Sequence, residues 1–209
     1  MNSITKTRIL IAVAVIFHII GFTGIGILHN GLISSATPFH LLLMAGLLLA
    51  SYSSDIKQFA KWAAIAYLIG FVAEAAGVHT GLVFGHYSYG TVLGPKLSGV
   101  PLLIGMNWVV VLIGAIAVAS KISDKPLQQS LIAAAVATAY DWVMEPVAVK
   151  LGYWQWQGGV IPLYNYLCWF VISLRIALLA NKLKITANNF SLWLFLIQLV
   201  FFILLRIVL

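Results

Sequence analysis

The chain alternates between long apolar stretches and short polar segments. Seven apolar stretches, each near the ~20 residues needed to cross the hydrocarbon of a bilayer, predict helices. The predicted spans are 8–28, 39–54, 61–78, 100–120, 127–149, 161–181 and 190–209. The pattern therefore predicts an all-α integral membrane protein, folded as a single membrane domain over residues 1–209.

Composition agrees with this interpretation. The chain is 62% hydrophobic and 8% charged, whereas about 25% of the residues in a soluble domain are charged. The first apolar stretch is too long for a signal-peptide core and is followed by no clear cleavage site, so we expect it to be retained. The single cysteine, Cys168, excludes a disulfide framework or a thiolate metal cluster.

The basic residues predict an orientation in the membrane. With a cytoplasmic N-terminus and an outside C-terminus, the outside segments contain only Lys96 and Lys150. The inside segments then contain Lys6, Arg8, Lys57, Lys61, Lys121, Lys125, Lys182 and Lys184. The net charge of +7 is thus mainly a topology signal, and no basic patch on a soluble face indicates a nucleic-acid partner.

In this orientation the polar residues within the spans gather near the outer face. They include two carboxyl groups four residues apart, which share one face of a helix. They are Glu74, His79, Asn107, Asp141, Glu145 and Asn165. Because like charges that close in a low dielectric repel, one acid of the pair is expected to be protonated and able to donate a proton.

A structural interpretation of these acids stays open, since a carboxylate could pair with Arg175 or Lys150. Three acids on one side of the membrane nevertheless favour function, because charge within a bilayer is energetically costly. Pro146 is expected to break the helix and leave the carbonyl of Trp142 without its usual partner.

The segment between the third and fourth spans is rich in glycine and aromatic residues. Glycines at 81, 85, 90, 94 and 99, with two prolines, predict a folded loop that either lies over the site or forms an ordinary interfacial loop. Trp154 and Trp156 are compatible with a membrane-interface belt or with the site. Trp108, Trp142 and Trp169 lie deeper, where aromatic faces could stabilise a cation.

Two blocks resemble a known family. Residues 74–108, "EAAGVHTGLVFGHYSYGTVLGPKLSGVPLLIGMNW", and residues 140–169, "YDWVMEPVAVKLGYWQWQGGVIPLYNYLCW", are similar to motifs of a carotenoid biosynthesis membrane-protein family. Its described members include bisanhydrobacterioruberin hydratase and gamma-carotene 1'-hydroxylase. The family usually has aspartate before the proline, where this chain has Glu145.

The resemblance implies a cofactor-independent hydratase in a bacterial or archaeal cell membrane. It would add water to the terminal double bond of lycopene, gamma-carotene or a similar carotenoid, with no metal site. Asp141 or Glu74 would be the acid, and Glu145 would tune that acid or accept a proton from water. The expected substrate- and water-binding residues are Asn107, Asn165, His79, Tyr87, Tyr89, Trp108, Trp142 and Trp169.

Other classes with similar features are separable by sequence or by product. A rhodopsin needs a lysine in its last span, and residues 190–209 contain none. Di-iron hydroxylases need closely spaced histidines, and a membrane prenyltransferase needs two aspartate-rich motifs; this chain has neither. A lycopene-cyclase-like enzyme, which forms a ring without added oxygen, and a proton-coupled transporter remain as alternatives.

Overall fold

The computed structural model describes residues 3–52 and 55–209, and most of this part of the chain is helical. Six helices are long and apolar enough to cross a membrane, and α3 is a shorter apolar helix, which confirms the predicted class. The helices are α1 (Ser3–Phe22), α2 (Gly31–Ser35), α3 (Thr37–Ser51), α4 (Ile56–Thr80), α5 (Leu102–Ala119), α6 (Pro126–Lys150), α7 (Leu163–Lys182) and α8 (Asn189–Val208). A π-helical turn, Thr23–Ile27, extends α1.

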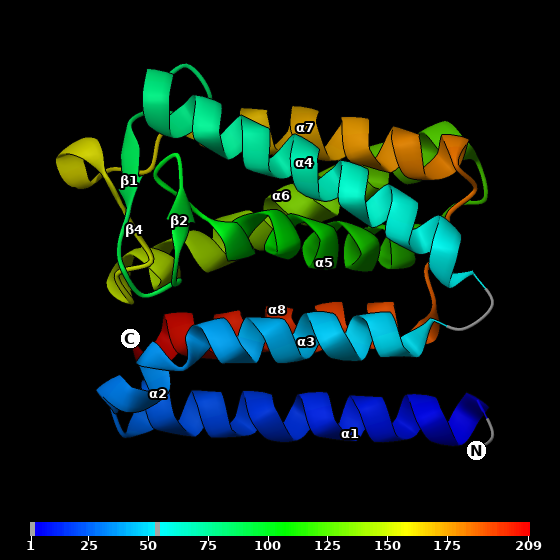
Figure 1. Ribbon diagram of the computed structural model, residues 1–209, viewed down its shortest axis with the longest axis horizontal. Coiled ribbons are helices and arrows are strands. Elements are labelled where there is room, and N and C mark those ends of the chain that lie inside the picture. Colours follow the sequence, from blue (N-terminus) through cyan, green and yellow to red (C-terminus); the bar gives the residue numbers. More distant parts are fainter. Residues whose placement is uncertain (1–2, 53–54) are drawn as a thin grey trace.

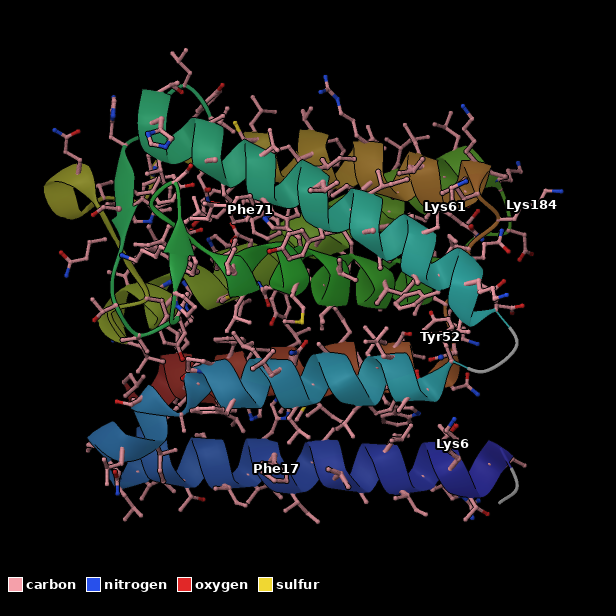
Figure 2. The ribbon with its side chains drawn as sticks, in the orientation of Figure 1. Lys6, Phe17, Tyr52, Lys61, Phe71 and Lys184 are labelled. Carbon is pink, nitrogen blue, oxygen red and sulfur yellow. The ribbon has the colours of Figure 1, made fainter. Side chains whose placement is uncertain are left out.

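The long helices run alternately up and down, so that the two termini lie at opposite ends of the bundle (Figure 1). The predicted span 39–54 corresponds to α3, and positions 53 and 54 lie outside the described residues. Figure 2 shows Lys6, Lys61 and Lys184 together at the N-terminal end of the bundle. The short strands lie at the opposite end, beside the C-terminus (Figure 1).

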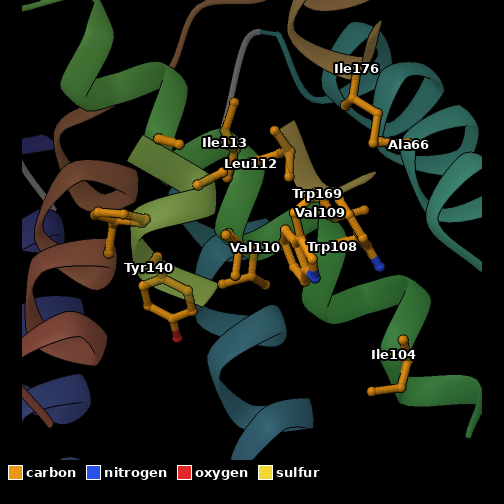
Figure 3. Close-up of a cluster of buried hydrophobic side chains, with 14 of the residues drawn as sticks. Ala66, Ile104, Trp108, Val109, Val110, Leu112, Ile113, Tyr140, Trp169 and Ile176 are labelled. Atoms are coloured by element: carbon orange, nitrogen blue, oxygen red, sulfur yellow. The ribbon is translucent and has the colours of Figure 1, made fainter. Parts of the chain in front are cut away.

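Helix α5 is at the centre of the bundle. It packs against α3, α4, α6, α7 and α8, and every residue from Val109 to Ala117 is buried. Figure 3 shows its apolar side chains meeting those of neighbouring helices. At Gly114 the contact with α8 is close, because an added Cβ would lie 2.5 Å from the Cβ of Phe195. The long apolar run of α5 thus reflects burial on all sides rather than exposure to lipid.

The expected helix break at Pro146 does not occur, because α6 is continuous from Pro126 to Lys150. Proline removes one N–H, and the carbonyl of Trp142 loses its partner four residues on. Nη1 of Arg206 on α8 donates to that carbonyl at 2.9 Å, and its guanidinium lies 4.3 Å from the centre of the Trp142 ring. A tertiary contact thus satisfies the free carbonyl, and the helix continues.

The predicted folded loop between the third and fourth spans is confirmed. Strand β1 (Tyr87–Tyr89) pairs antiparallel with β4 (Trp154–Trp156), and β2 (Lys96–Leu97) pairs with β3 (Val100–Pro101). After β1, Gly90 passes so close to the second loop that an added Cβ would lie 2.0 Å from the carbonyl oxygen of Gly152. Only glycine permits this approach, which holds the two loops together over the ends of α4 and α6.

The close packing at Gly114 gives a test of the fold. Gly114→Ala places a methyl group against Phe195 and is expected to lower the free energy of unfolding by about 1–3 kcal/mol, as overpacked cores do. Gly46→Ala is the matched control, because a Cβ there has no atom within 4 Å. Thermal unfolding in detergent would measure both, and equal stability of the two variants would contradict the packing described.

Candidate active site

Three carboxyl groups meet near the strand-bearing end of the bundle. Glu74 on α4 and Asp141 and Glu145 on α6 are all buried, with at most 5% of each side chain exposed. All three line one cavity of about 20 Å³. A cavity needs at least about 10–15 Å³ to hold a water molecule, so this one has room for a single water.

Uncharged aromatic donors surround the carboxyl group of Glu74. The hydroxyls of Tyr87 and Tyr89 donate to its Oε2 at 2.5 and 2.7 Å, and Nε1 of Trp108 donates to Oε1 at 3.0 Å. Burial and the nearby Glu74 raise the pKa of both tyrosines, so both phenols remain protonated donors. Every recorded donor to Glu74 is thus neutral, and no cation is among them.

Glu145 likewise has aromatic hydrogen-bond donors, which come from the loop that follows α6. The indole nitrogens of Trp154 and Trp156 both donate to its Oε2 at 3.0 Å. Side chains alternate along a strand, so Trp154 and Trp156 point the same way while Gln155 between them is exposed. The register pairs Tyr87 with Trp156 and Tyr89 with Trp154. One small sheet therefore presents four donors to two carboxyl groups.

Asp141 has an oxygen with no partner. Nδ2 of Asn165 donates to Oδ2 of Asp141 at 2.9 Å and lies 3.5 Å from Oε1 of Glu145, so it bridges the two acids. The other oxygen, Oδ1 of Asp141, is buried without a hydrogen-bond partner among the described residues. Because an unpaired buried polar atom is destabilising, this oxygen is the one free to meet a ligand.

Two stacked tryptophans form a wall of the cavity. The rings of Trp108 and Trp169 lie 3.9 Å apart and nearly parallel, from α5 and α7 (Figure 3). Gly70, one turn before Glu74 on α4, makes this possible, because a Cβ there would lie 2.4 Å from the Trp108 ring. The wall therefore offers an extended aromatic face close to the three acids.

A larger apolar cavity of about 480 Å³ adjoins the small one. Ile104, Asn107, Met144 and Trp154 line both cavities and form the boundary between them. Leu32 and Phe39 also line the larger cavity and are 82% and 73% exposed, so it reaches the exposed apolar surface of α2 and α3. The volume lies within the ~300–1,000 Å³ typical of small-molecule sites.

Most of the site residues proposed from the sequence lie around the small cavity. Those that line it are Glu74, Tyr87, Tyr89, Asn107, Trp108, Asp141, Glu145, Asn165 and Trp169. His79 and Trp142 do not: both are exposed, and Trp142 contacts Arg206. Helical geometry explains this, since residues one or five positions from an inward-facing acid point roughly 100–140° away from it.

The sequence pattern indicates no role in the cavity for Phe84, Ile104 or Met144, and it is compatible with either a belt or a site role for Trp154 and Trp156. The W-x-W at residues 154–156, after Glu145, has the same alternation as the Y-x-Y at residues 87–89. This similarity is the signal in the sequence for the two tryptophans. Within residues 3–52 and 55–209, no group of three or more His, Cys, Asp or Glu side chains is arranged to hold a metal ion.

The two indole donors to Glu145 predict an effect on the stability of the fold. Trp156→Phe keeps a ring but removes one N–H donor to a buried carboxyl group, which should destabilise the fold by about 1–3 kcal/mol. Trp154→Phe should behave alike, whereas Gln155→Ala, on the exposed side of the same strand, should change stability by less than about 0.5 kcal/mol. Unfolding in detergent measures the three; an equal effect of Gln155→Ala would contradict the assignment.

Comparison with known proteins identifies a family for the chain. No curated protein and no solved structure gives a significant match. Residues 37–209 match the carotenoid biosynthesis protein family, a range that begins with α3 and includes all three acids but omits α1 and α2. Since this range is most of the chain, the protein is a multi-pass membrane member of the carotenoid biosynthesis protein family.

Proposed function

We propose that the protein is a carotenoid hydratase, which adds water across the terminal carbon–carbon double bond of an acyclic carotenoid end. The observation that carries this proposal is the pair of adjoining cavities. One has room for a single water among three carboxyl groups, and the other is apolar and reaches the exposed apolar surface. Membership of the family supports a carotenoid, such as lycopene or gamma-carotene, as the substrate.

In the first step an acid protonates the double bond. Asp141 is assigned this role because its Oδ1 is buried and unpaired, whereas the oxygens of Glu74 accept three hydrogen bonds. The proton is added to the less substituted carbon, and the π electrons form the new C–H bond. This leaves a tertiary carbocation at the outermost branched carbon and a carboxylate on Asp141.

In the second step water captures the cation. The oxygen of the water in the small cavity forms a C–O bond with the cationic carbon, and the surplus proton passes to a carboxylate. Glu145 is assigned as this base, since two indole N–H groups hold its Oε2 and its other oxygen lies by Asn165. General acid–base catalysis of this kind requires two positioned carboxyl groups in different environments.

The cavity also suits the charge of the intermediate. The stacked rings of Trp108 and Trp169 present aromatic π density, which attracts a cation, and the neighbouring Glu74 lines the same cavity. Asn107 lies on the boundary between the cavities and makes no recorded hydrogen bond within the described residues, so its amide is free to orient the water. Water addition transfers no electrons between molecules, and the scheme therefore includes no redox cofactor.

The product is a tertiary alcohol that is heavier than the substrate by one water. We place the reaction in the cell membrane of a bacterium or archaeon, where the carotenoid would reach the apolar cavity from the bilayer. A single acyclic end fits the scheme, and the rest of the polyene would extend into the lipid beyond Leu32 and Phe39.

Amide replacement of the acids tests the proposal. In a lycopene-producing host, the wild-type chain is expected to give carotenoids with the mass of one or more added waters. Asp141→Asn and Glu145→Gln remove the acid and the base, and the hydrated product should fall at least about 100-fold. Glu74→Gln should also lower it, because the cavity loses its third carboxyl group. Chromatography with mass spectrometry of extracted carotenoids measures each yield.

Two variants serve as controls. Asp124→Asn replaces an exposed acid between α5 and α6, and Trp142→Phe changes an exposed ring outside both cavities. Both should retain wild-type yield at equal protein level. Unchanged hydration in all three acid variants would overturn the catalytic assignment, and a cyclised product without added oxygen from the wild type would overturn the hydratase itself.

A further inference from the structure

Three polar side chains in the wall of the larger cavity have no role in the proposed reaction. His18 on α1, His40 on α3 and Gln198 on α8 line the apolar cavity and do not line the small cavity with the acids. His18 and Gln198 are 5% and 4% exposed. Polar groups buried this deeply in an apolar wall are unfavourable unless they have partners.

The hydrogen bonds of the two histidines fix which nitrogens remain available. Nδ1 of His18 lies 2.7 Å from the carbonyl oxygen of Ala14, and a carbonyl only accepts, so Nδ1 is the donor. In neutral His18, Nε2 is then an acceptor, and His40 must donate to it from its own Nε2, 3.4 Å away. His40 is thus left with an acceptor at Nδ1, which has no recorded partner in the described part of the chain.

Gln198 adds a second free acceptor. Its Oε1 is buried without a hydrogen-bond partner among residues 3–52 and 55–209. Phe201, one turn further along α8, lies on the same side of the helix and packs edge-on against the ring of His18, with centroids 5.3 Å apart. Gln198 and the histidines therefore face the same part of the cavity.

The other hydroxyl groups of this wall already have partners. The hydroxyls of Thr37 and Tyr153 lie 3.0 Å apart and bond to one another. Burial raises the pKa of Tyr153 to about 12, so this hydroxyl keeps its proton. Nδ1 of His40 and Oε1 of Gln198 are thus two free acceptors in this wall, and they suit a ligand that donates a hydrogen bond while the rest of it is apolar.

We propose that His40 and Gln198 form a subsite for the hydroxyl group of a terminal carotenoid alcohol. The hydrogen bond with His18 fixes the tautomer of His40. This inference rests on the proposed function, because that alcohol is the product of the hydration. A hydroxyl in an apolar cavity without a partner is destabilised. As the new end group leaves the acids, the subsite accepts its O–H. His18 lies outside the matched residues 37–209, so the family match does not imply the subsite.

Direct binding of two matched carotenoids tests the subsite. The purified chain with Asp141→Asn, in detergent, would be titrated with lycopene and with lycopene hydrated at one end, and quenching of tryptophan fluorescence gives each dissociation constant. The alcohol is expected to bind about fivefold or more tightly, as one or two added hydrogen bonds imply. Adding Gln198→Leu or His40→Phe should bring the ratio of the two constants close to one.

Ser173→Ala is the matched control. Ser173 Oγ is also buried and unpaired among the described residues, but Ser173 lines neither cavity, so its loss should leave the ratio unchanged. Equal binding of the two carotenoids in the Asp141→Asn background would overturn the subsite, as would a preference that survives in both Gln198→Leu and His40→Phe.

The hydration assay separates this inference from the proposed function. If the wild type hydrates lycopene while the two carotenoids bind equally, the subsite is wrong and the reaction stands. If no hydrated product forms, yet the alcohol is preferred through Gln198 and His40, the subsite stands and the reaction is wrong. If neither carotenoid binds and no hydrated product forms, both are overturned.

Discussion

The placing of three carboxyl groups at membrane depth is the constraint on which the rest of this structure depends. A carboxyl group in hydrocarbon is strongly destabilised unless hydrogen bonds replace its lost water. The protein provides these bonds from phenol, indole and amide groups, and no cation is among the recorded donors to Glu74, Asp141 and Glu145. The acids are thereby held in place without ion pairs among the recorded contacts, which is compatible with the proposed roles of acid and base.

The carboxyl groups' need for hydrogen-bond donors explains the conformation of two loops, the one between α4 and α5 and the one between α6 and α7. A helix cannot direct four aromatic donors at two carboxyl groups on different helices, but two paired strands can, since alternate residues share a face. Strands β1 and β4 do so, and Gly90 allows the loops to approach closely enough. The glycine-rich segment is therefore part of the site. Its two tyrosines, Tyr87 and Tyr89, donate hydrogen bonds to Glu74 rather than forming a membrane-interface belt.

The two cavities differ in the chemistry of their lining. The smaller is lined by acids and donors, the larger by apolar side chains that reach the exposed apolar surface, and Asn107 stands at their boundary. The proposed hydration would use this arrangement, because its carotenoid substrate partitions into an apolar cavity whereas its water would be held among polar groups. Packing of α5 against five neighbouring helices keeps the boundary residues of α5, Ile104 and Asn107, in a rigid setting.

The sequence by itself determined the spans, the gathering of acids at one end and the shared face of Asp141 and Glu145, because hydrophobic length and helical period are local properties. For the spans without such polar side chains it could not determine which face points inward, because lipid and protein interior are equally apolar. Tertiary packing decided that Arg206 satisfies the carbonyl of Trp142 beside Pro146, and that one oxygen of Asp141 stays unpaired. It also decided the pairing of β1 with β4, since the two strands lie more than sixty residues apart and meet only because α4 and α6 end at the same end of the bundle (Figure 1).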